Sequence, residues 1–350
     1  MATGWGRILS IALVVLLAAS CSSTASRSAT SPTTKTRPPG LNGTDTTAAA
    51  SSTSAPVQPG SRPKVLVAVT TAGAVQALDP ATGKALRTLA TGAIGEEIGL
   101  SPDGLTVYYE TPVGCAHQIN RVPTAGGTST VLGSGGHPTM SPDGTLLAYV
   151  LQPGFGAGTT ACDRADTSAG AYAVVVRDLA RGGEKSFPLP PAVVSGGLPL
   201  PIAHLSWAAD NRRLAVTIGG GQDNEQWSVS IMDRTRDTNY PGATSVPVSG
   251  PARTYYREVV FLPNGDLFVD RECCAGYPPH VTSSELATVD AATGVSLQQV
   301  AIGLTTRDHG SLDADASGHW LLYLSGPDLL VSEDGARPTT LATGFQAATW

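Results

Sequence analysis

The chain has little charge and few aromatic side chains. Charged residues make up 14% of its 350 residues and aromatic residues 5%. Lys and Arg together number 22 against 28 Asp and Glu, which gives a formal net charge of −6. There is no basic stripe to neutralise a phosphate backbone, which argues against nucleic acid as a partner. Beyond residue 21 no apolar run is long enough to cross a bilayer.

Enzyme signatures are also scarce. The sequence has no Gly-x-Ser-x-Gly elbow, no His-Glu-x-x-His and no phosphate-binding Gly-rich loop ahead of a helix. The run Asp313-x-Asp315-x-Ser317-Gly318 resembles a calcium loop, but its twelfth position is Leu324 rather than Glu. We therefore expect no metal ion and no cofactor, and we favour a role without catalysis.

The N-terminus has the order of a secretory signal. Arg7 is followed by an apolar run over residues 8–17 and by small residues before Cys21. An apolar run of this length is too short for a permanent membrane span and is typical of a signal peptide, here residues 1–20.

The small residues and Cys21 resemble the bacterial lipobox, in which the Cys receives diacylglycerol and becomes the mature N-terminus. One departure is Ala18, where Leu is usual. The resemblance implies an exported protein anchored through Cys21 to the outer face of the cell membrane. Ordinary signal cleavage near the same point, which would release a secreted protein, is the alternative.

Residues 21–62 are dominated by Ser, Thr, Ala and Pro. Such a segment cannot bury enough apolar surface to offset its ordering entropy, so we expect a disordered tether. Residues 63–350 have a composition that suits one large all-β domain.

Internal repeats are the main signal in this domain. Ser101-Pro102-Asp103-Gly104 and Ser141-Pro142-Asp143-Gly144 each lie between two apolar segments of strand type. We call this the A–B turn, because it joins the first two strands of each repeat. Weaker copies occur at 206–210, 262–265 and 313–318.

A second turn type, which we call the C–D turn, alternates with the first. It follows a short apolar strand and usually contains Asp and Gly. Six copies are present, at 79–83, 123–127, 178–183, 233–237, 290–294 and 333–335.

Six C–D turns against five A–B turns indicate a closed ring. The repeat that begins at Val65 lacks its A strand, while residues 345–350 have the pattern of an A strand without a repeat to follow. If the last strand completes the first blade, both facts are explained. The sequence therefore predicts an all-β fold, a six-bladed β-propeller closed by its C-terminal strand. Seven blades would need a sixth A–B turn.

This repeat resembles that of TolB-type propellers, which are close to WD-type repeats. The shared order is a strand, Ser-Pro-Asp-Gly, an apolar strand, and then a strand ending in Asp before a Gly-containing turn. Residues 137–183 follow it well, and the three later blades keep the shape without the Ser-Pro-Asp letters. The opening blade is more similar to YVTN-type surface propellers. The resemblance implies a TolB-like, WD-repeat-like propeller lipoprotein of bacteria, and it identifies architecture better than activity.

Four cysteines follow Cys21, and all fall in predicted B–C loops. An even number in an exported domain points to disulfides. We expect a pair between neighbouring blades and a second pair between adjacent residues, either as a structural staple or as a platform for a ligand. The pairs are Cys115 with Cys162, and Cys273 with Cys274.

The B–C and D–A loops are predicted to be long, and they lie on the face that usually binds ligands in propellers. Loops beyond about 12 residues are uncommon unless they have a function or are disordered. Charged and aromatic residues of this face form a candidate binding surface, with a solvated rim of ion pairs as the alternative. They are Glu97, Tyr256, Arg257, Glu258, Arg307, Asp308 and His309.

Three functions follow from these observations. The first is a monomeric, tethered binding or scaffold module for a protein, peptide or glycan. The second is a lyase or hydrolase in which His309 works with Asp308 or Glu258 as acid and base. The third and weakest is a quinoprotein-like oxidoreductase resting on the vicinal cysteines.

Overall fold

The computed structural model describes residues 61–114, 116–151, 172–188, 202–219, 227–237, 244–248, 255–273, 283–304 and 311–350. These residues belong to one compact unit, Ala55–Trp350. They form β-strands, turns and connecting segments, and no helix in this part of the chain is long and apolar enough to cross a membrane.

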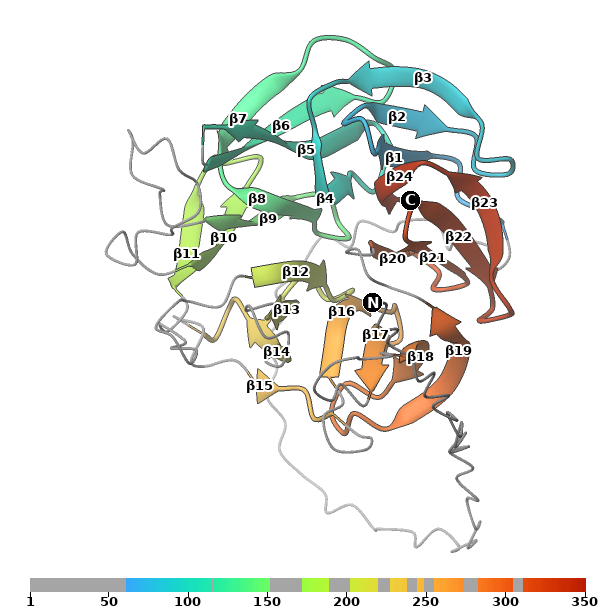
Figure 1. The fold of residues 1–350 in the computed structure, drawn as a ribbon. Coiled ribbons are helices and arrows are strands. Elements are labelled where there is room, and N and C mark those ends of the chain that lie inside the picture. Colours follow the sequence, from blue (N-terminus) through green and yellow to red (C-terminus); the bar gives the residue numbers. More distant parts are fainter. Residues whose placement is uncertain are drawn as a thin grey trace, which may run out of the picture. The chain divides into compact units, whose positions relative to one another are not determined.

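The strands form six antiparallel four-stranded sheets, the blades of a propeller. Figure 1 shows them arranged in a ring in chain order, with the first strand of each blade nearest the centre. Blades 1 and 2 are β24 (Phe345–Thr349), β1 (Leu66–Thr70), β2 (Val75–Leu78) and β3 (Ala85–Ala90), then β4 (Ile94–Leu100), β5 (Thr106–Val113), β6 (Ala116–Pro123) and β7 (Thr130–Ser134).

The next two blades have the same order. Blades 3 and 4 are β8 (Gly136–Met140), β9 (Leu146–Leu151), β10 (Ala173–Asp178) and β11 (Glu184–Pro188), then β12 (Ile202–Trp207), β13 (Arg213–Ile218), β14 (Ser228–Asp233) and β15 (Thr244–Ser245).

The last two blades complete the ring. Blades 5 and 6 are β16 (Tyr255–Phe261), β17 (Leu267–Cys273), β18 (Ser283–Val289) and β19 (Ser296–Leu304), then β20 (Leu312–Ala314), β21 (Trp320–Ser325), β22 (Asp328–Glu333) and β23 (Thr339–Thr343).

Blade 1 contains strands from both ends of the domain. β24 pairs antiparallel with β1, with Ala68 opposite Ala348 and Val67 opposite Thr349. In Figure 1 the C-terminal strand lies beside the blue first strand. The prediction of six blades closed by the C-terminal strand is confirmed.

The A–B turns are held by the side chains that the repeat motif supplies. In blade 3 the Ser141 hydroxyl donates to Asp143 and accepts from the Leu146 backbone N–H, at 2.7 and 2.9 Å. Gly144 has a φ of 72°, a left-handed conformation that glycine adopts without a steric penalty. Blade 2 repeats these bonds at Ser101.

The hydrophobic core is divided among the interfaces between blades. Six clusters of buried residues occur, one between each pair of neighbouring blades. Val67 and Val107, for example, pack between blades 1 and 2, and Leu66 and Leu322 between blades 6 and 1. Fully burying a side chain of this size contributes about 1.5–3 kcal/mol, so the core holds the blades to one another. The inner strands are left free to line a central channel.

Several predictions fall on residues outside the described ranges. These include the signal peptide, residues 21–60 of the predicted tether, nearly all of the predicted long loops, and most of the cysteines. One predicted loop begins later than expected, because β17 extends through Cys273. The side chain of Cys273 is not described, and the other four cysteines, Cys21, Cys115, Cys162 and Cys274, lie outside the described residues.

Candidate functional site

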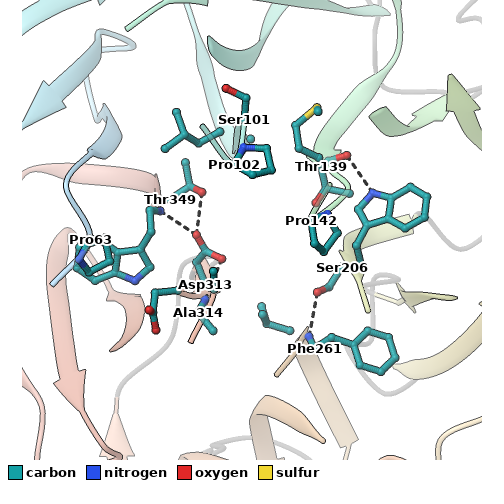
Figure 2. Close-up of a pocket in the computed structure, with 18 of the residues that line it drawn as sticks. Pro63, Ser101, Pro102, Thr139, Pro142, Ser206, Phe261, Asp313, Ala314 and Thr349 are labelled. Carbon is teal, nitrogen blue, oxygen red and sulfur yellow. Dashed lines mark hydrogen bonds between the residues drawn. The ribbon is translucent and has the colours of Figure 1, made fainter. Parts of the chain in front are cut away.

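The inner strands of the six blades surround a channel. Each inner strand contacts the inner strands of both neighbouring blades, so the circle of contacts is closed. A cavity of about 640 Å³ occupies the end of this channel that opens between the A–B turns. In Figure 2 the labelled residues come from all six blades and surround the open space; among them are Ser101, Pro142, Ser206, Phe261, Asp313 and Thr349.

β-Bulges interrupt five of the inner strands at nearly the same depth. In β12 the pairing with β13 shifts between Ile202 and His204, and in β16 the pairing with β17 shifts between Tyr256 and Glu258. β8 and β24 also have one extra residue at this depth, and β4 has three, between Ile94 and Ile98. A bulge bends its strand and re-aims side chains, and at this depth the residues are aimed at the channel.

The residues at this depth share a position in the repeat. Each stands four residues before the residue whose carbonyl closes its A–B turn in the structure, which is Ser101, Ser141, Ala208, Leu262 or Asp315. The pairing of β24 with β1 places Ala347 at the same level. We call these residues the channel ring. In blade order they are Ala347, Glu97, His137, His204, Glu258 and Ser311.

Glu97 connects three blades of the channel ring. Its Oε2 lies 3.1 Å from His137 Nδ1, and its Oε1 lies 3.3 Å from His204 Nδ1. Blade 4 is not a neighbour of blade 2, so the Glu97 side chain extends into the channel to reach His204. Glu97 and His204 both line the cavity and close its inner end, and both side chains are 7% exposed.

His137 is held in an unusual backbone conformation. Its φ of 52° lies in the left-handed region, which costs a non-glycine residue about 1–2 kcal/mol. Its backbone N–H donates to Glu110 Oε1 at 2.5 Å, and the other oxygen of Glu110 lies 3.0 Å from His117 Nδ1. Strained residues cluster at functional sites when their surroundings over-determine them, as they do here.

Glu258 is the second carboxylate of the channel ring. Its Oε2 accepts a 2.9 Å hydrogen bond from the Leu312 backbone N–H. Burial raises the pKa of Glu258 well above its ordinary value, and the negative charges of Asp270 and Glu97 raise it further. The neighbouring Arg257 opposes this shift. Because the pKa is raised, Glu258 holds its proton more firmly than a surface carboxyl.

His204 is kept neutral by its surroundings. Burial lowers the pKa of His204, and the nearby charge of His137 acts in the same direction, against the attraction of Glu97. Among the described residues its Nε2 has no hydrogen-bond partner. The inner end of the cavity therefore contains a buried polar atom whose bonding capacity is unused.

A third carboxylate, Asp313, lies in the wall of the cavity. It accepts hydrogen bonds from Thr349 Oγ1 and the Trp350 backbone N–H, at 2.7 and 2.9 Å (Figure 2). Burial nevertheless raises the pKa of Asp313 to about 6. These bonds also fix β24 against blade 6.

The segment 61–65 crosses the outer part of the cavity and contributes its basic residues. The Arg62 guanidinium donates to the carbonyls of Pro80 and Ala81, each at 3.1 Å, and lies 4.4 Å from the ring centre of Trp320. These contacts hold Arg62 at the rim, away from the channel ring.

Two histidines beside a glutamate are residue types that can bind a metal ion. Within the described ranges, no group of three or more His, Cys, Asp and Glu side chains could hold a metal ion. Glu97, His137 and His204 are joined by hydrogen bonds and charge contacts within the protein.

The structure places the predicted site residues in different environments. Glu97 and Glu258 belong to the channel ring. Tyr256 lies fully buried between blades 4 and 5, with its hydroxyl donating to the Gly294 carbonyl at 3.2 Å. Arg257 has its Nε 3.7 Å from Glu272 Oε2. The remaining three, Arg307, Asp308 and His309, lie outside the described residues.

Sequence reasoning missed His137 and His204. Both had a usable signal, because each stands four residues before its A–B turn, as Glu97 and Glu258 do. Sequence reasoning also placed the candidate surface at the long loops, whereas the cavity opens between the A–B turns. Nothing in the described residues tests the long-loop surface, and it stays a prediction.

The fold and the channel define the class of protein: the chain is a six-bladed β-propeller. No protein-family model and no curated protein sequence matches it. Among solved structures it is similar to TolB from Acinetobacter baumannii, with 13% identity over 82% of this chain and a TM-score of 0.56. The chain spans 65% of the length of that protein. At this identity the likeness shows the fold alone.

Two other solved structures are similar at lower scores. One is hydrazine synthase from Kuenenia stuttgartiensis, with 13% identity, 80% of this chain and 79% of the other covered, and a TM-score of 0.46. The other is the β-propeller domain of the Trilobed protease from Pyrococcus furiosus, with 15% identity, 70% of each chain covered and a TM-score of 0.43.

Proposed function

We propose that this protein is an exported binding module that receives a protruding segment of a protein or peptide in its channel cavity. The observation that supports this most directly is the cavity itself, which all six blades line and in which polar groups converge at the inner end. Its volume of about 640 Å³ lies within the range of ligand pockets, roughly 300–1,000 Å³.

The walls of the cavity suit a ligand with both apolar and polar parts. Leu100, Met140, Leu205 and Trp207 supply apolar surface. Glu97, His204 and Ser311 of the channel ring supply polar groups. Because these residues stand on paired strands and their immediate turns, the site is formed before any ligand arrives. Pre-formed sites avoid the entropic cost of ordering loops on binding.

The proposal includes a location. The signal peptide over residues 1–20 and the lipobox-like Cys21 support export and anchoring to the outer face of the membrane, with residues 21–62 as tether and the propeller acting as a monomer. The mass of the mature N-terminus tests this: a diacylglyceryl group on Cys21 is expected, and its loss in Cys21→Ala should release the protein. A mature N-terminus without lipid would overturn the anchor.

A blocked cavity tests the binding site. Ala316 is exposed and lines the outer cavity, so Ala316→Trp should obstruct entry without disturbing the core. Ala292 is exposed in the C–D turn of blade 5, and Ala292→Trp provides a matched control. The probe is a phage-displayed library of random peptides, selected on the domain 63–350 and screened against both variants.

The expected result is that selected peptides bind the wild type and Ala292→Trp equally and lose at least tenfold in affinity for Ala316→Trp. If selected peptides ignore Ala316→Trp but fail on a variant of Arg307, Asp308 and His309, the long-loop face is the site and the channel proposal fails. If no peptide is enriched while a glycan array gives ligands that Ala316→Trp blocks, the peptide assignment fails.

A further inference from the structure

The inner end of the cavity contains an unused hydrogen-bond acceptor. His204 is neutral at neutral pH, because burial lowers its pKa. Its Nδ1 faces the Glu97 carboxylate at 3.3 Å, which favours the tautomer with the proton on Nδ1. Nε2 then has a free lone pair, and it has no partner among the described residues. An unsatisfied buried polar atom destabilises the fold, and a ligand that donates a hydrogen bond to it recovers that loss.

The electrostatic environment of this acceptor is negative. Among the described residues that line the cavity, four are carboxylates and two are Lys or Arg. Both basic residues, Arg62 and Lys64, belong to the outer segment 61–65, and Arg62 is bonded at the rim. The carboxylates are Glu97, Asp103, Asp313 and Asp315.

The position of Glu97 is fixed by residues of blades 2 and 3. His137 holds one of its oxygens, and Glu110 in turn holds the His137 backbone. A carboxylate fixed in this way keeps its charge directed at the channel instead of turning to meet solvent. The arrangement is thus a built site, with a positioned acceptor and a positioned charge beside it.

We propose that the inner end of the cavity binds a cationic N–H donor, the guanidinium or primary ammonium of a basic side chain. Nε2 has almost no accessible surface in the unliganded protein, so a small turn of the His204 imidazole brings it to the donor, whose charge is balanced by Glu97. This inference rests on the proposed function, since it names the chemistry of the segment that enters the channel.

The chemistry favours a cation over the other simple ligand classes. A carboxylate or phosphate would face Glu97, and among the described residues that line the cavity the Lys and Arg belong only to segment 61–65. Like charges at close range repel strongly in a site of low dielectric. A purely apolar group would leave Nε2 unsatisfied.

The direct test uses small probes of one shape and different charge: butylguanidinium, butylammonium, butanol and butyrate. Their binding to the compact unit 55–350, which keeps Arg62, is followed by NMR titration. His204→Phe removes the acceptor at similar volume, and Glu97→Gln removes the charge. Glu184→Gln removes a carboxylate from the outer strand β11, outside the cavity lining, and is the matched control.

We expect the two cations to bind, and butanol and butyrate to bind at least tenfold more weakly. His204→Phe and Glu97→Gln should each weaken the cations by about tenfold or more, which corresponds to a hydrogen bond with a charged group. Glu184→Gln should have no effect. Thermal unfolding of each variant establishes that it is folded, and Glu97→Gln serves as the second variant should His204→Phe fail to fold.

The outcome separates this inference from the proposed function. If displayed peptides require the open cavity but the cations bind no better than butanol, the cation site is wrong and the binding module stands. If butyrate binds best, the polarity of the site is the reverse of that proposed. If neither peptides nor cations bind, both proposals fail.

Discussion

At the residue scale, Asn211 shows how one copy of the repeat accommodates a different amino acid at the glycine position of its turn. It occupies the position of glycine in the A–B turn of blade 4, with a φ of 54° where Gly104 and Gly144 have 71° and 72°. Asn enters the left-handed region more readily than most residues. Its Oδ1 also accepts a 3.1 Å hydrogen bond from the Asp143 N–H, which links blade 4 to blade 3.

Replacing Asn211 tests this backbone requirement. Both Asn211→Ala and Asn211→Gly lose the bond to Asp143, but only alanine pays for the left-handed conformation. We expect Asn211→Ala to be less stable than Asn211→Gly by about 1 kcal/mol or more, measured by denaturant unfolding. Equal stability of the two variants would show that the turn changes its conformation.

Asp313 gives the domain a specific dependence on pH. Its pKa is about 6 in the fold against 3.8 ordinarily, so the unfolded chain loses this proton first as the pH rises. The stability that the protonated form contributes is therefore complete below about pH 4 and is lost as the pH rises towards 6.

Asp313→Asn isolates this group. Because the variant has no proton to lose there, its free energy of unfolding should rise relative to the wild type between about pH 4 and 6. The change should be at most about 3 kcal/mol, the equivalent of the pKa difference. Denaturant unfolding across this range measures it, and a constant difference between the two proteins would contradict the burial of this carboxyl.

At this scale, the channel ring contains both residues that the sequence predicts and residues that it does not. Glu97 and Glu258 are predictable as channel residues because they are charged residues in apolar strands. His137 and His204 have the same repeat position, yet nothing in their local sequence reveals that Glu97 extends between blades to meet both. Contacts across the channel depend on side-chain reach, which no repeat motif encodes.

At the element scale, the A–B turns keep the same hydrogen bonds although their amino acids differ. In blade 6 the hydroxyl and the carboxylate have exchanged positions: Asp315 stands where blade 3 has Ser141, and Ser317 where it has Asp143. Asp315 accepts from the Trp320 N–H at 2.8 Å and from Ser317 Oγ at 2.5 Å. This explains why blade 6 keeps the shape of the repeat without its motif.

The exchange can be reversed by mutation. Asp315→Ala should cost about 1–3 kcal/mol, because the buried Trp320 N–H loses its acceptor. The double variant D315S with S317D recreates the order of blade 3, and we expect it to stay within about 1 kcal/mol of the wild type. Thermal or denaturant unfolding compares the three proteins; a double variant as unstable as Asp315→Ala would refute the equivalence of the two turns.

Turns were predictable at this scale because Ser, Pro, Asp, Asn and Gly each have a local physical reason to be there. The bulges were not predictable. The extra residue in β12 or β16 is ordinary in type and shows only in the pairing with the next strand. Since the bulges aim the channel ring, the position of the cavity could not be deduced from strand patterns alone.

At the scale of the whole molecule, ring closure makes stability depend on both ends of the domain. Without β24, blade 1 loses its inner strand, and Phe345, Ala347 and Ala348 leave the core between blades 6 and 1 and between blades 1 and 2. Counting turns in the sequence was enough to predict this closure, because a ring requires the missing strand to come from the other end.

Deleting residues 345–350 tests the closure. We expect a loss of at least about 2 kcal/mol, the contribution of burying Phe345 alone. Thermal unfolding and limited proteolysis would measure the loss. A synthetic peptide of residues 344–350 should restore part of the stability, and an unchanged unfolding temperature in the truncated domain would show that β24 does not seal the ring.

The place of β1 in blade 1 also has a mechanical meaning. β1 is not an edge strand, since it is paired on one side with β2 and on the other with β24. A pulling force that enters the propeller through segment 61–65 therefore acts on a strand held along both sides. Such a strand cannot be peeled away one hydrogen bond at a time, as an edge strand can, and must shear two ladders together. This arrangement resists tension that enters at the N-terminal end of the propeller, the end that the anchor proposed at Cys21 would load.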